Sequence, residues 1–344
     1  MQNLKSSNAK RRKLLYYLYH TPLVYFFPSI ISRFRLKNIL NNSFQEEYIQ
    51  SRVSYYFKKT SNFRVSNEGK NLSELFWNQF FKNKQNSHFI DFYNLLQFFN
   101  KKNKVDFIYS TKDYIDSSIA KKHPPYPTFV KSRPVGFNNQ NSILLKLNQV
   151  KLFHFIKDPK KFENKKNQAV WRGDIRNNSI RKYFVKNFYR TPLFDIGQTS
   201  PKQDVPWMKS FMSIKDQLDY KFIFCLEGKC ISTNLYWAMS SNSVCVMPKP
   251  KYESWFMEGK LEDEVHYIKV KDDFSDAEEK IEFYKNKNNK CLEIVDNANK
   301  FVEQFKDSKQ ERLIQLLILK QYFKSTGQYE YCLLYTSPSP RDSC

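Results

Sequence analysis

The chain of 344 residues is long enough for two ordinary domains, and its 41% hydrophobic and 17% aromatic content excludes a disordered protein. Only 7 glycines are present, and neither a P-loop nor a GxGxxG sequence occurs, which argues against glycine-rich phosphate loops. The 6 cysteines lie in the second half and form no CxxC pair. Neither a disulfide framework nor a zinc site is therefore predicted, and a reducing compartment is favoured.

The net charge of +23 is concentrated in the first part of the chain. Residues 1–104 carry 18 Lys and Arg against 5 Asp and Glu, whereas residues 171–330 are close to neutral. This asymmetry predicts an anionic partner for the first half. A nucleic acid, an anionic membrane surface and a phosphorylated acceptor are all compatible with it.

The N-terminal segment combines basic and apolar residues. Four basic residues at 10–13 precede an apolar, aromatic stretch at 14–31 that His20, Pro22 and Pro28 interrupt. The stretch is too broken for a membrane-spanning helix, and it lacks the cleavage site of a signal peptide. It is equally compatible with a segment lying in a membrane interface and with a helix packed on the protein body.

Residues 40–104 have the apolar spacing of helices, and residues 105–109 read as a strand. Asp113 lies just past the expected end of that strand, where open α/β sheets hold their sites. An aspartate in this position is more often a cap or a solvated turn residue. A charged linker at 157–166 marks the expected domain boundary.

The second half alternates strands and helices, which is typical of a doubly wound α/β sheet. The expected strands cover residues 169–171, 193–196, 222–226, 244–247 and 266–270. The expected helices cover about residues 180–188, 276–284, 289–306 and 309–324. Ser275 with Glu278 and Glu279 predicts a capping box for the second of these helices.

Two turns in this half could hold an anion. The turn after residue 171 carries Arg172 and Gly173, with Arg176 and Arg181 at the start of the next helix. The turn at 227–228 leads to a Ser-Thr-Asn helix start at 232–234, where free N–H groups and the helix dipole can bind phosphate. Surface ion pairs and ordinary helix capping are the alternatives for these two turns.

Several ordered motifs resemble glycosyltransferase family 90, the family of protein O-glucosyltransferases and bacterial lipopolysaccharide-modifying transferases. They are WRG at 171–173, EGKCISTNLYWAMSSNSVCVMPKP at 227–250, WF at 255–256 and HYIKVKDDFSDAEEKI at 266–281. KSRPVG at 131–136 and NSILLKLNQV at 141–150 resemble the bacterial lipopolysaccharide branch most closely. The resemblance covers roughly residues 105–306.

The resemblance implies an α/β, GT-B-like fold of two Rossmann-like domains with a helical, basic N-terminal extension. The corresponding divisions are a basic, largely helical region at 1–104, the rest of the acceptor-side domain at 105–160, and a nucleotide-sugar domain at 165–325. Residues 333–344 differ in composition from the rest and look like a non-native tail.

The resemblance also implies an inverting transfer without a metal or another cofactor, from a UDP-sugar to a glycan hydroxyl. Among hexoses and pentoses the resemblance favours glucose as the sugar, and it favours a lipopolysaccharide core as the acceptor. Asp113 resembles the catalytic base. The residues implied in donor binding are Arg172, Gly173, Arg176, Arg181, Glu227, Gly228, Lys229, Ser232, Thr233 and Asn234. The residues implied on the acceptor side are Lys131, Ser132 and Arg133.

Two departures from the family pattern leave alternatives at the donor site. Arg181 is one position out of register with the arginine that contacts the diphosphate in eukaryotic members of the family. Arg176 is therefore the alternative candidate for this diphosphate contact. Asn234 stands where eukaryotic members carry a phosphate-binding arginine, and Lys229 is a possible substitute.

Other functions also fit parts of the sequence. They are transfer of glucose or xylose to a protein hydroxyl, a non-enzymatic role as a basic nucleic-acid-binding protein, and an inactive transferase acting as a scaffold. The transferase hypothesis itself expects no nucleic acid as partner. It places the protein in the cytoplasm, with possible peripheral attachment to a membrane, or in an endomembrane lumen if the source is eukaryotic.

Overall fold

The computed structural model describes residues 11, 14–18, 47–58, 61–65, 70–71, 87–96, 98–99, 104–105, 127–136 and 139–329. The chain divides into two compact units. The first takes in the described residues up to Val150 and from Ser308 onward, and the second runs from Lys151 to Asp307. Asp113 and the tail at 333–344 lie outside the described residues.

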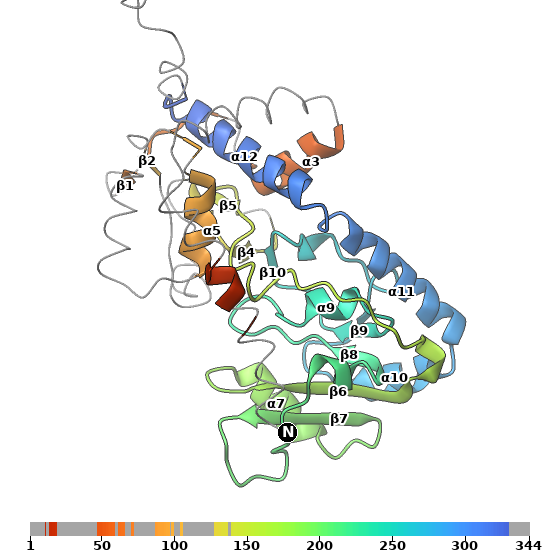
Figure 1. Cartoon of the computed structure of the whole chain (residues 1–344). Helices are drawn as coiled ribbons and strands as arrows, with labels where there is room; N and C mark the ends of the chain where they lie inside the picture. Colours follow the sequence, from red (N-terminus) through yellow and green to blue (C-terminus); the bar gives the residue numbers. More distant parts are fainter. Residues whose placement is uncertain are drawn as a thin grey trace, which may run out of the picture. The chain divides into compact units, whose positions relative to one another are not determined.

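The second unit is built on a five-stranded sheet in which every neighbouring pair of strands is parallel (Figure 1). Its strands are β6 (Lys166–Asp174), β7 (Phe194–Ser200), β8 (Tyr220–Phe224), β9 (Val244–Met247) and β11 (Ile268–Lys269). All residues of β8 and β9 are buried, as expected for the centre of a sheet that is covered on both faces.

Helices and short elements precede, connect and follow these strands. They are η1 (Phe162–Asn164), α7 (Ser179–Phe188), α8 (Ile214–Gln217), α9 (Leu235–Met239), β10 (Tyr252–Ser254), η2 (Glu258–Lys260), α10 (Ala277–Lys285) and α11 (Asn288–Glu303). Alternate strand residues such as Trp171, Phe222 and Val244 form one core with side chains of α7 and α10. The short helix α9 instead packs against β9 and α11.

The order of strands across the sheet is β7-β6-β8-β9-β11. The chain therefore moves outward from β6 to β7 and then returns past β6 to begin β8. In open α/β sheets, ligands bind beyond the carboxyl ends of the two strands at which this reversal occurs. Those strands are β6 and β8, and the segments that follow them are the two turns singled out in the sequence.

The doubly wound α/β prediction is confirmed for the second unit, while two details of it are wrong. Asp276, not Ser275, occupies the N-cap of α10 and makes no side-chain capping bond, so the predicted capping box is absent. A capping box forms instead at α8, between Ser213 and Asp216. The helix expected at 309–324 is α12 (Ser308–Ser325), which belongs to the first unit and packs there against α3 (Glu47–Tyr56).

The first unit also contains α5 (Ser87–Leu96), β1 (Lys70–Asn71), β2 (Lys104–Val105), β3 (Thr128–Val130), β4 (Ser132–Pro134) and β5 (Ser142–Leu144). β1 pairs with β2 and β3 with β5. A buried ionic network ties its segments together, because Glu311 on α12 accepts from Arg52 on α3 at 2.8 Å and from Lys146 after β5 at 2.8 Å. None of the described helices is both long and apolar enough to span a bilayer.

Candidate functional site

The end of β6 is shaped by Trp171 and Gly173. Trp171 is buried, and a side chain at position 173 would bring its Cβ within 2.4 Å of the indole ring. Glycine is therefore needed at 173 so that the ring can lie along the strand. The guanidinium carbon of Arg181 lies 5.8 Å from the centre of this ring, a cation–π arrangement that helps to fix the arginine.

Arg181 connects the carboxyl ends of β6 and β8, the two strands at which the strand order reverses; this place is called the reversal point below. Its Nε donates to the Glu227 carbonyl at 3.1 Å and its Nη2 to the Leu226 carbonyl at 2.8 Å, both beyond β8. Its Nη1 reaches the Asp174 carbonyl at the end of β6, at 3.3 Å. Burial lowers the pKa of Arg181, but a guanidinium stays protonated at neutral pH. A fixed positive charge thus lies where this class of sheet binds ligands.

The N-terminus of α7 lies at the same point. Asn178 is its N-cap, and the side-chain Oδ1 accepts from the backbone N–H of Arg181 at 2.8 Å. The Nδ2 of Asn178 donates to the Gly228 carbonyl at 2.8 Å, which ties the helix start to the turn after β8. Asn178 was not among the predicted site residues, although an asparagine before an amphipathic run signals a helix start.

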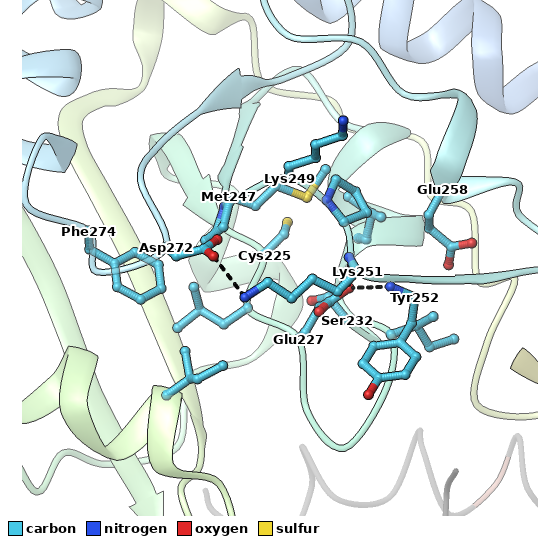
Figure 2. A pocket seen from close by; sticks show the side chains of 16 residues that line it. Cys225, Glu227, Ser232, Met247, Lys249, Lys251, Tyr252, Glu258, Asp272 and Phe274 are labelled. Atoms are coloured by element: carbon cyan, nitrogen blue, oxygen red, sulfur yellow. Dashed lines mark hydrogen bonds and ion pairs between the residues drawn. The ribbon is translucent and has the colours of Figure 1, made fainter. Parts of the chain in front are cut away.

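A small pocket that opens to solvent lies beyond the carboxyl ends of β8, β9 and β11, and Figure 2 shows the side chains that line it. Cys225, Leu226 and Glu227 contribute one wall, and residues 247–252 contribute another. Asp272 follows β11 and forms an ion pair with Lys251 at 2.8 Å, with both side chains at least half exposed. Every lining residue belongs to the second unit.

Glu227 and Glu258 are two acids of this pocket whose pKa is strongly raised by burial. The Oε1 of Glu227 accepts from the backbone N–H of Lys251 at 2.9 Å and of Tyr252 at 3.1 Å. Burial raises the pKa of Glu227 to about 7, although these two N–H groups favour the ionised form. Lys251 and Tyr252 were not among the predicted site residues, because no sequence pattern relates them to Glu227.

The Ser-Thr-Asn segment does not act as a helix cap. Asn234 is at the N-cap of α9 but makes no capping bond, and its Nδ2 donates to the Phe224 carbonyl at 2.9 Å. Ser232 is buried, lines the pocket and donates to Asn234 Oδ1 at 2.6 Å. Thr233 and Lys229 are exposed. α9 has only five residues, which is too short for the strong helix dipole that was expected here.

Arg172 and Arg176 have other partners. Arg172 has a side chain only 7% exposed, and it pairs with Asp195 at 2.6 Å on β7. Lys209 and Tyr220 donate to the same carboxylate. Burial alone would raise the pKa of Asp195, but the hydrogen bonds from Lys209, Tyr220 and Arg172 outweigh it and hold that pKa well below its usual range. Arg176 is 62% exposed and pairs with Asp174. Of the three arginines proposed for the donor, only Arg181 bridges the ends of β6 and β8.

The predicted acceptor-side residues lie in the first unit. Lys131 is half-buried, and Ser132 is buried. Arg133 is 1% exposed and donates to the backbone carbonyls of Tyr55 at 2.7 Å and Ser142 at 2.8 Å. The structure thus gives Arg133 an internal role in joining α3 to β5, which the sequence did not suggest.

Comparison with known proteins covers most of the chain. Residues 144–326 match the model of glycosyl transferase family 90. The chain is 37% identical over 276 residues to "O-glucosyltransferase LpsA" of Dichelobacter nodosus, covering 80% of this chain and 82% of that protein. It is also 31% identical over 98 residues to "Uncharacterized protein 179R" of Invertebrate iridescent virus 6, which covers 26% of this chain and 8% of the viral protein.

The family match includes the elements that form the reversal point and the pocket, from β6 through β11. The bacterial relative extends the similarity over most of both chains. On these grounds the chain belongs to glycosyl transferase family 90 and is a glycosyltransferase.

Proposed function

We propose that this protein transfers a hexose or pentose, most readily glucose, from a UDP-sugar to a hydroxyl of a glycan, with inversion and without a metal. The observation that carries the proposal is the position of Arg181 and the α7 N-terminus beside the pocket. A fixed guanidinium and a helix N-terminus suit a diphosphate, whose charge grows as it leaves the sugar. The name of the bacterial relative, an O-glucosyltransferase, supports glucose as the transferred sugar.

The proposed arrangement is that of a GT-B enzyme. The parallel sheet of the second unit would bind the nucleotide sugar, and the first unit would present the acceptor. In an inverting transfer the acceptor oxygen attacks the anomeric carbon on the face opposite UDP, and the bond to the diphosphate oxygen breaks. A carboxylate takes the hydroxyl proton as the new bond forms. Asp113 is the proposed base, and Arg181 the proposed counter-charge for the departing UDP.

The proposed acceptor is an anionic glycan such as a lipopolysaccharide core. The basic first half of the chain supports an anionic partner, since residues 1–104 carry 18 Lys and Arg against 5 Asp and Glu. A protein hydroxyl is the runner-up acceptor, because the wider family includes protein O-glucosyltransferases. Family membership weighs against a nucleic-acid-binding role, for which the net charge and the aromatic content argue.

The direct test is an assay of the purified protein with a panel of UDP-sugars, measuring UDP release and sugar transfer to lipooligosaccharide and to peptide acceptors. UDP-glucose is expected to be the best donor, and activity is expected to survive EDTA. A strict requirement for Mg²⁺ or Mn²⁺ would contradict metal-free transfer. Tight UDP binding without turnover on any acceptor would favour the scaffold alternative.

The N-terminal segment has features of a membrane-surface contact. Residues 14–18 are helical, and Tyr16 donates to the buried Asp91 of α5, which docks one side of the segment on the first unit. Leu14, Leu15 and Leu18 are 59%, 55% and 61% exposed. Apolar side chains beside a basic cluster are typical of interfacial helices, so a peripheral attachment to an anionic membrane is part of the proposal.

Replacing Leu14, Leu15 and Leu18 by serine is expected to abolish binding to anionic lipid vesicles, because it removes the apolar contact and keeps Tyr16. Wild-type binding is expected to weaken with added salt, since each basic residue near an anionic surface contributes about 1 kcal/mol. Co-sedimentation with vesicles of anionic and of neutral lipid measures both effects. Equal sedimentation of the two proteins, or none by either at low salt, would show that the segment has no role at a membrane.

A further inference from the structure

Asn178 uses both ends of its side-chain amide. The Oδ1 atom caps α7 by accepting from the backbone N–H of Arg181 at 2.8 Å. The Nδ2 atom donates to the backbone carbonyl of Gly228 at 2.8 Å and, at the longer distance of 3.4 Å, to that of Glu227. One side chain therefore joins the start of α7 to the turn that follows β8, although the two lie 50 residues apart in the sequence.

Capping alone does not require an asparagine at this position. Asparagine, aspartate and serine are about equally good at a helix N-cap, because each offers an oxygen to the free N–H groups of the first turn. Aspartate has no N–H donor when ionised, and the hydroxyl of serine ends closer to the backbone than the amide nitrogen of asparagine does. The bond to Gly228 is therefore what the asparagine adds to an ordinary cap.

The backbone before α7 fixes the place of Asn178. Asn177 has a φ of 54°, in the left-handed region that asparagine tolerates better than most residues. The Ile175 N–H donates to the Ser200 carbonyl at 3.1 Å, and the Ile175 carbonyl accepts from the Asn178 N–H at 3.3 Å. Asn178 is thus held by its backbone on the β6 side and by its side chain on the β8 side.

Three successive carbonyls after β8 accept hydrogen bonds from residues at the start of α7. The Leu226 and Glu227 carbonyls accept from Arg181, and the Gly228 carbonyl accepts from Asn178. Arg181 makes its two bonds through Nη2 and Nε, which are also atoms with which a guanidinium binds phosphate. An anion that draws the guanidinium toward itself would weaken two of the three bonds, whereas the bond of Asn178 would persist.

We propose that Asn178 is a positioning residue for the diphosphate of the donor. It keeps the turn at 226–228 attached to the start of α7, so that Arg181 can turn toward the leaving UDP without releasing that turn. This inference rests on the proposed use of a UDP-sugar. In this role Asn178 acts through the placement of Arg181 and not through a bond of its own to the ligand.

The test is calorimetric binding of UDP and UMP to the full chain and to variants at position 178. Asn178→Ser keeps a capping oxygen but loses the bond to Gly228, and it is expected to bind UDP about 3- to 10-fold more weakly than wild type, as for one lost hydrogen bond. The loss is expected to be smaller for UMP, which lacks the second phosphate. A general disturbance of the fold would weaken the binding of both ligands alike.

Thermal unfolding separates capping from positioning. Asn178→Ala loses the cap as well as the bond to Gly228, so it should unfold at a lower temperature than Asn178→Ser while binding UDP equally well. Ser213→Ala is the matched control, because Ser213 caps α8 by accepting from the N–H of Asp216 at 3.2 Å. This control should lose stability and keep the UDP affinity of wild type.

A double-mutant cycle tests whether Asn178 acts through Arg181. In an Arg181→Ala background, Asn178→Ser is expected to cause little further loss of UDP affinity, because the guanidinium that Asn178 positions is no longer there. Asn178→Thr also keeps a capping hydroxyl, and it repeats each comparison if the serine variant fails to fold.

Three outcomes would overturn the inference alone. They are an unchanged UDP affinity of Asn178→Ser, an equal loss of affinity for UDP and UMP, and full additivity of Asn178→Ser with Arg181→Ala. Failure of the wild type to bind UDP at all would overturn the proposed donor as well.

Discussion

Asp113→Asn is expected to lower the rate of sugar transfer by about 10²–10⁴-fold, because the amide cannot take the acceptor proton as the glycosidic bond forms. UDP binding should be almost unchanged, since the loss concerns the chemical step. Turnover with UDP-glucose and a glycan acceptor, together with UDP titration, separates the two effects.

Asp116→Asn is the matched control for this variant, because it removes a carboxylate from the same stretch of chain. Both residues lie outside the described part of the structure, so the assignment of Asp113 rests on its sequence context. Near wild-type turnover of Asp113→Asn would remove it from the mechanism. An equal loss in both variants would indicate a general disturbance of that stretch.

Arg181→Ala is expected to weaken UDP binding by about 1.5–3 kcal/mol, the range for a charge-assisted hydrogen bond to an ionised group. The substitution removes a half-buried guanidinium that bridges the ends of β6 and β8. Isothermal titration gives the affinity, and thermal unfolding gives any accompanying loss of stability.

Arg176→Ala provides the comparison, since Arg176 is exposed and pairs with Asp174 beyond the same strand. Its UDP affinity should stay close to that of wild type. A larger loss for Arg176→Ala than for Arg181→Ala would transfer the diphosphate contact to Arg176. Arg181→Lys should give an intermediate affinity, because it keeps the charge but loses the planar fork of donors.

The sequence by itself determined the alternation of strands and helices in the second unit. Hydrophobic runs of strand length and the helical spacing of apolar residues are local properties, and burial in a covered sheet requires them. The prediction for β9 at 244–247 is identical to the observed strand, and that for α7 differs by one residue. The two turns that face the candidate site were likewise marked by their local sequence.

Only the tertiary structure decided which polar side chains are available to a ligand. Arg172 and Arg181 both looked suited to phosphate, but Asp195 on the neighbouring strand binds Arg172, while Arg181 reaches across to β8. Glu227 is fixed by backbone N–H groups more than twenty residues further along the chain. Such pairings depend on the order of strands in the sheet, which local patterns of hydrophobicity do not encode.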